Sequence, residues 1–113
     1  MNKIKSENFT IEFIEQIQVR LVFMYKIKVT CHKSKKFEAK KILCNSGFNL
    51  TVKNIFDCNG VELIDTKKMK KDDVIECYIA FQKSDTATNQ PSFSYEGKKE
   101  IVKGVKINGG NNN

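Results

Sequence analysis

Apolar residues occupy every odd position from Ile17 to Cys31, and this long alternation constrains the fold more than any other feature. Alternation of apolar and polar residues predicts a strand with one buried face. At about 3.3 Å per residue the run would extend roughly 50 Å, too long for one strand in a small domain. A second, overlapping pattern is a four-residue spacing of Phe9, Phe13, Ile17 and Leu21. That spacing is typical of an amphipathic helix, so we predict a helix over Phe9 to Leu21 that gives way to a strand near Val19.

The middle of the chain contains two clearer signals. Asn59-Gly60 lies between apolar runs, which predicts a β-hairpin with a type I′ turn. Val74 to Phe81 is nearly all apolar, which predicts a central strand buried on both faces. The basic stretch from His32 to Lys41 is compatible with a turn, a short strand or a surface helix, and its sequence does not separate them.

The composition changes near residue 82. Residues 83–94 are polar and contain the only proline, and the chain ends in Asn-Gly-Gly-Asn-Asn-Asn. Such a segment buries too little apolar surface to offset the entropy lost on ordering. We therefore predict one folded domain over residues 1–82 and a flexible polar tail over 83–113, with a short edge strand near Ile101 or a segment ordered by a partner as the alternatives.

Charge and cysteine usage limit the function classes. The chain has 113 residues with 20 basic and 13 acidic side chains, a formal net charge of +7. No apolar run is long enough to span a bilayer and no signal peptide is apparent, so we expect a cytoplasmic protein without membrane contact. The four cysteines form no Cys-x-x-Cys pair and only His32 could join them, so we expect no metal, no cofactor and reduced thiols, with Cys58 and Cys77 packed in or beside strands. No catalytic constellation is apparent either.

The order of helix, strand, turn, strand, loop and buried strand favours an α+β fold, a ubiquitin-like β-grasp with one helix packed on a small mixed sheet. Within that class the chain resembles the doublecortin domain. The resemblance covers the strand and Asn-Gly turn of residues 52–64, the short turn of 66–69 and the acidic turn and final strand of 72–80. The family's usual opening hairpin is missing, so the resemblance is to a divergent or partial member.

Doublecortin domains bind microtubules, so the resemblance implies tubulin as partner, a cytoskeletal location and no catalytic residues. A basic protein is attracted to the acidic surface of tubulin. The candidate partner-binding residues are Lys33, Lys35, Lys36, Lys40, Lys41, Lys67, Lys68, Lys70 and Lys71. Two alternatives use the same charge: a basic ubiquitin-like module with another acidic protein partner, and nonspecific nucleic-acid binding supported by Phe37 and Phe48 near lysines. A solubilising lysine face is the plainer interpretation of both clusters.

Overall fold

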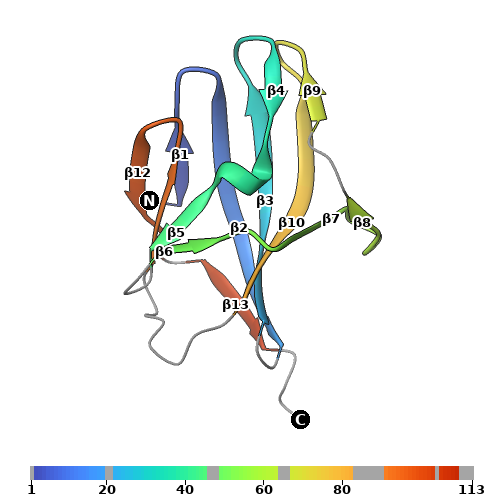
Figure 1. Cartoon of the computed structure of the whole chain (residues 1–113), viewed down its shortest axis with the longest axis vertical. Coiled ribbons are helices and arrows are strands. Elements are labelled where there is room, and N and C mark those ends of the chain that lie inside the picture. The colour runs from blue at the N-terminus through green and yellow to red at the C-terminus, as the bar shows by residue number, and fades with distance from the viewer. Residues whose placement is uncertain are drawn as a thin grey trace.

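The computed structural model describes residues 2–19, 22–45, 49–63, 67–82, 91–103 and 105–109, which fold almost wholly into β-strands (Figure 1). Among these residues the single helical element is a 3-10 turn, η1 (Ala39–Lys41). The predicted α+β class is therefore wrong. So is the ubiquitin-like β-grasp, because it requires a helix packed across the sheet. The strands form three sheets instead.

The largest sheet has seven strands in the order β1-β2-β3-β10-β7-β8, with β13 joined to β2. These strands are β1 (Lys3–Lys5), β2 (Phe9–Val19), β3 (Val22–Cys31), β7 (Asn54–Phe56), β8 (Glu62–Leu63), β10 (Val74–Gln82) and β13 (Lys106–Gly109). All neighbours are antiparallel except β13, which runs parallel to β2. The long strands β2, β3 and β10 lie side by side along the long axis of the molecule in Figure 1.

Residues 9–19, predicted as a helix, form strand β2 instead. A four-residue spacing does not separate the two structures, since every fourth residue also lies on one face of a strand. Phe9, Ile11 and Phe13 are all fully buried. Burial of every second residue is the pattern of a strand and not of a helix. β2 and β3 then pair as a hairpin, which divides the long alternation between two strands. Leu21, the end of the predicted helix, lies outside the described residues.

A β-bulge interrupts β2, where the pairing with β3 shifts register between Phe13 and Glu15. An extra residue in one strand exchanges the faces of all residues beyond it. Past the bulge, Gln16 stands opposite the buried Tyr25, so Ile17 lies on the outer face of the sheet. The bulge explains why the apolar pattern of this strand is not a simple alternation.

The second sheet has four strands in the order β12-β11-β5-β6 and packs on the first. Its strands are β5 (Leu43–Asn45), β6 (Asn49–Thr51), β11 (Ser92–Tyr95) and β12 (Lys98–Ile101). The Phe93 ring joins the two sheets, with its centroid 4.5 Å from that of Phe13, 4.9 Å from Tyr25 and 5.9 Å from Phe81. Fully burying an aromatic side chain of this size stabilises a fold by about 1.5–3 kcal/mol.

The C-terminal segment, predicted as a polar tail, contributes three strands to the fold. Phe93 and Tyr95 alternate with serines in β11, and both aromatic rings are buried in the core. Val102, after β12, is also buried. The polar composition of the whole segment concealed this short alternation. Residues 83–90, 104 and 110–113 of the predicted tail lie outside the described residues.

The third sheet is a two-stranded ribbon of β4 (Lys35–Phe37) and β9 (Lys67–Met69), which lies near the top of Figure 1. The basic stretch whose structure the sequence left open thus contains a strand followed by η1. Because β4 and β9 are far apart in sequence, their pairing brings two distant parts of the chain together.

Two predictions from the middle of the chain are confirmed in outline. β10 is a central strand between β3 and β7, although Val74 and Glu76 in its first half are exposed. A hairpin also joins β7 to β8 at Asn59-Gly60. Its turn is not type I′, since only Gly60 has a positive φ, of 83°. It is a longer loop, closed by the hydrogen bond that the Asp57 N–H donates to the carbonyl of Val61.

Candidate functional site

The ribbon brings together the two lysine clusters that the sequence singled out. β4 and its neighbours carry the lysines between residues 33 and 41, and β9 with the turn after it carries those between 67 and 71. Within the ribbon, Lys36 pairs directly with Lys68 across the two strands. The clusters therefore share one part of the surface, which the sequence could not establish.

The two faces of the ribbon have opposite character. Phe37 and Met69 point inward and are buried. The Phe37 ring centroid lies 5.4 Å from that of Phe9 and 5.5 Å from that of Tyr95. Alternation along the strands puts Lys36 and Lys68 on the outer face. Like charges directly opposite one another destabilise a strand pair. The apolar inner face therefore has to offset the repulsion between these lysines.

Hydrogen bonds fix the lysine-rich turn that follows β9. The Lys71 N–H donates to the Ser34 hydroxyl at 3.2 Å, which ties the turn to the segment before β4. The Lys70 N–H donates to the Asp73 carboxylate at 2.8 Å, which closes the turn. Both lysine side chains are exposed, so the backbone is anchored while the charges face solvent.

Three of the nine predicted lysines form ion pairs. These join Lys33 to Glu7 at 3.1 Å, Lys35 to Glu96 at 2.7 Å and Lys41 to Glu38 at 3.1 Å. The other six are exposed and make no ion pair with any described residue. We call these six the ribbon lysines: Lys36, Lys40, Lys67, Lys68, Lys70 and Lys71.

Most of the net charge is located around the ribbon. Residues 33–41 and 67–73 together carry nine lysines and three carboxylates, a net charge of +6 out of +7 for the chain. The rest of the protein is thus close to neutral. A concentrated charge of this kind produces a directed field at short range, whereas the same charge spread evenly would not.

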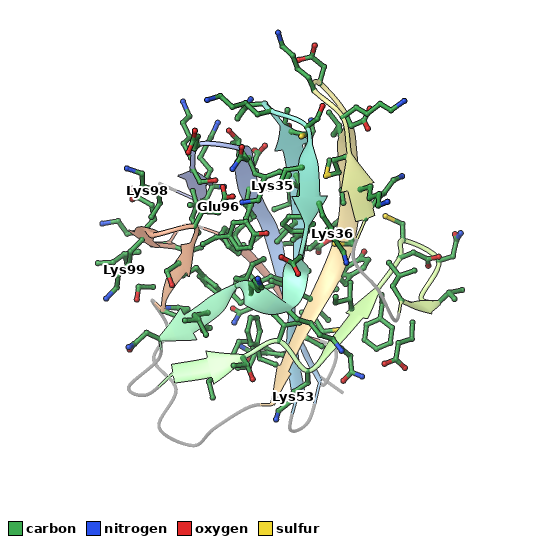
Figure 2. The ribbon with its side chains drawn as sticks, turned by 45° about the horizontal axis from the view of Figure 1, so that its top comes forward. Lys35, Lys36, Lys53, Glu96, Lys98 and Lys99 are labelled. Atoms are coloured by element: carbon green, nitrogen blue, oxygen red, sulfur yellow. The ribbon has the colours of Figure 1, made fainter. Side chains whose placement is uncertain are left out.

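Glu96 forms the centre of a hydrogen-bond network beside the ribbon. Its carboxylate accepts from the Ser6 hydroxyl at 2.6 Å, the Asn8 amide at 2.8 Å and the Lys35 ammonium at 2.7 Å. Partial burial of the Glu96 carboxyl would raise its pKa, but the hydrogen bonds from Lys35, Ser6 and Asn8 outweigh burial and lower that pKa to about 2. Figure 2 shows Lys35 and Glu96 beside one another. The network links β4 to the β1–β2 and β11–β12 turns.

The turn that carries Glu96 is a type I′ turn. Glu96 and Gly97 have φ values of 49° and 77° between the antiparallel strands β11 and β12. Both central residues of a type I′ turn need positive φ, and glutamate is uncommon there. The hydrogen bonds of its carboxylate offer a reason why glutamate occupies a position that asparagine or glycine usually takes.

Sequence reasoning missed Glu96 and assigned no role to the exposed lysines outside the two clusters, among them Lys53, Lys98 and Lys99. Lys98 and Lys99 belong to β12, and Lys53 lies between β6 and β7. In the view of Figure 2, Lys98 and Lys99 lie on the other side of Glu96 from Lys36. The alternation in β11 followed by Gly97 is the signal that could have placed Lys98 and Lys99 in a folded hairpin.

An apolar pocket lies between the ribbon, η1 and the β7–β10 part of the large sheet. Its volume is about 260 Å³, and its lining residues are Phe37, Ala39, Ile55, Leu63, Lys67, Ile75, Glu76 and Cys77. Lys67 is the one ribbon lysine that lines the pocket directly. Leu63 and Ile75 are only half-buried, so apolar surface remains open to solvent here.

Two of the cysteines, Cys44 and Cys77, are poorly suited to act as nucleophiles. All four are free, and Cys58 is exposed in the β7–β8 turn while the others are buried. Burial raises the pKa of Cys44 to about 12, which disfavours the nucleophilic thiolate. Burial, with a smaller effect of Cys58, does the same for Cys77. Within the described ranges, no three His, Cys, Asp or Glu side chains gather as metal ligands.

Comparison of the chain with protein-family models, curated proteins and solved structures found no match. Among the described residues, none belongs to a helix that could cross a membrane.

Proposed function

We propose that this protein is a non-catalytic interaction module that binds an acidic protein surface through the ribbon lysines. The observation that carries the proposal is the β4–β9 pairing, which gathers both lysine clusters on one part of the molecule. Six exposed lysines there have no ion-pair partner among the described residues. An acidic partner would supply the missing counter-charges.

The like-charge pair of Lys36 and Lys68 supports the same proposal. Two lysines directly opposite one another cost stability in the free protein. A carboxylate placed between them would turn that repulsion into attraction, so part of the cost would be recovered on binding. Because exposed charges are screened within about 8 Å at physiological salt, the binding should weaken as salt rises.

Nucleic-acid binding receives less support from the site. Binding of single strands normally combines cations with exposed aromatic rings on which bases stack. Phe37, one of the two rings considered for that role, is buried against Phe9 and Tyr95. Phe48, the other, lies outside the described residues. The chain also has a single arginine, Arg20, the residue type best suited to bidentate phosphate contacts.

Tubulin remains one candidate for the acidic partner, together with the cytoplasmic, cytoskeletal location that it implies. Its support is now charge alone. The doublecortin resemblance rests on short motifs within residues 52–80, and the helix packed on a sheet that it implied is absent from the described residues. Any protein surface or tail rich in carboxylates meets the same chemical requirement.

The test measures the binding of the whole protein to three probes at low and moderate salt. The probes are polyglutamate, microtubules and single-stranded RNA. We expect polyglutamate to bind at low salt and to release as salt rises, with microtubules behaving alike if tubulin is the partner. Retention on RNA without binding to polyglutamate would overturn the proposal in favour of nucleic-acid binding.

A further inference from the structure

The pocket beside the ribbon combines an apolar lining with a cationic rim. Phe37 and Lys67 lie opposite one another in the ribbon, and both line the pocket. Ala39, the neighbour of the ribbon lysine Lys40, lines it as well. The pocket is therefore continuous with the surface that carries the ribbon lysines.

The pocket is open to solvent on one side because β7 is shorter than β10, the strand it pairs with. β3 pairs with β10 along its whole length, whereas β7 pairs only with Tyr78, Ile79 and Ala80. Beyond that ladder, Ile75 stays half-buried, although the next inward residue, Cys77, is buried. The apolar wall of the pocket thus reaches solvent along the part of β10 that does not pair with β7.

The pocket is large enough to accept one apolar side chain. Its volume of about 260 Å³ exceeds that of an apolar cavity of about 150 Å³ that accommodates benzene. The same volume is below the range of roughly 300–1,000 Å³ typical of sites for drug-sized ligands. One phenylalanine, leucine or methionine side chain would fit inside it, and a buried anchor of this kind is a common source of binding energy at interfaces.

A second apolar hollow, on the outer face of the large sheet, lacks the matching charge. It is lined by Ile17, Met24, Phe56, Cys58, Gly60 and Tyr78, with no lysine, arginine, aspartate or glutamate among them. The nearby Lys26, whose ammonium lies 6.0 Å from the centre of the Tyr78 ring, is already paired with Glu76 at 3.6 Å. That same pairing partly neutralises Glu76, the one carboxylate that lines the pocket beside the ribbon.

We propose that the acidic partner binds as a segment with one large apolar side chain, which enters the pocket while flanking carboxylates contact Lys67 and the other ribbon lysines. This inference rests on the proposed function and defines its partner more narrowly. It predicts that carboxylates alone bind weakly, and that one apolar residue among them increases the affinity.

The test uses two short synthetic peptides of equal charge, in which glutamates flank either a central phenylalanine or a central serine. We expect the phenylalanine peptide to bind the whole protein about tenfold more tightly, a gain of about 1.4 kcal/mol. Leu63→Asn should remove most of that gain. Val61→Asn is the matched control, because Val61 is close in sequence, 58% exposed and absent from the pocket lining.

Methyl NMR on the wild-type protein keeps the test independent of variant folding. Isoleucine methyl signals of Ile55 and Ile75 should shift with the phenylalanine peptide and much less with the serine peptide, while the exposed Ile101 stays unchanged. Equal affinities for the two peptides, or a gain without shifts at Ile55 and Ile75, would overturn the pocket inference and leave the lysine proposal standing. Failure of both peptides to bind at low salt would overturn both.

Discussion

Lys35 and Lys36 are neighbours in β4, yet they lie in contrasting environments. Lys35 reaches Glu96 at 2.7 Å and belongs to a network that holds three elements together. Lys36 points to the other face and stands opposite Lys68, with no carboxylate of the described residues paired to it. Lys35 is therefore neutralised by a carboxylate of the fold, whereas Lys36 and Lys68 repel each other.

The difference shows how a charged stretch in a sequence divides into two roles. Alternation along a strand sends adjacent lysines in opposite directions. Lys35, on the inner face, binds a carboxylate of the fold and contributes to stability, whereas Lys36 and Lys68, on the outer face, remain available to a partner. Substitutions on the inner face should therefore change stability, and substitutions on the outer face should change binding.

The largest effect is expected for Phe37→Ala. Phe37 is the apolar anchor of the inner face, and removing a buried phenylalanine side chain costs about 3–5 kcal/mol in the free energy of unfolding. Denaturant unfolding followed by circular dichroism measures this loss. Ile101→Ala is the control, because Ile101 is 55% exposed and should change stability by less than about 0.5 kcal/mol. Equal stabilities of the two variants would show that the ribbon is not packed as described.

Glu96→Asn should have the next largest effect. Asparagine suits the positive φ of the turn, so this variant keeps the turn and removes the carboxylate. We expect a loss on the order of 2–3 kcal/mol, because hydrogen bonds to charged groups are the strong ones. Glu100→Gln, in the exposed strand β12, is the control. A variant as stable as wild type would show that the network contributes nothing.

The same residue predicts the acid response of the protein. The pKa of Glu96 is lowered from 4.5 to about 2, so its contribution is present above pH 4.5 and is lost as the pH falls toward 2. The stability difference between wild type and Glu96→Asn should therefore shrink over that interval. Unfolding curves at several pH values measure the difference, and a difference independent of pH would contradict the assignment.

Lys36→Glu should give a small effect of the opposite sign on stability. It replaces a repulsive pair with Lys68 by an attractive one, which should stabilise the protein by about 0.5 kcal/mol. The same change removes a charge from the proposed binding surface, so the affinity for polyglutamate should fall. Thermal unfolding and titration calorimetry on the same sample separate the two responses. A drop in both would mean that Lys36 belongs to the inner, structural set.

The sequence predicted some individual strands but not the architecture. The run from Val74 to Phe81 is apolar enough to identify β10 without tertiary information. The helix over residues 9–21 was mistaken because a spacing of four residues fits both a helix and one face of a strand, and the bulge in β2 further disturbed the alternation. Strand pairing over long separations, such as that of β4 with β9, leaves no local signal.

The candidate site was only partly predictable for the same reason. The ribbon lysines are six of the nine lysines that local charge density indicates. Density alone could not show that Lys33 and Lys35 are ion-paired, since their partners Glu7 and Glu96 lie far away in sequence. Nor could it show that Phe37 and Lys67, distant in the chain, line one pocket.

The most direct test of the account compares two charge reversals in their affinity for polyglutamate at low salt. Lys36→Glu/Lys68→Glu reverses the outer face of the ribbon, and Lys99→Glu/Lys103→Glu reverses two exposed lysines outside the ribbon. Because each Lys→Glu change removes two units of charge, both variants lower the net charge from +7 to +3. We predict that the ribbon variant loses affinity at least about tenfold and the control less than about threefold. Equal losses would show that overall charge, not the ribbon, determines binding, and would contradict the account.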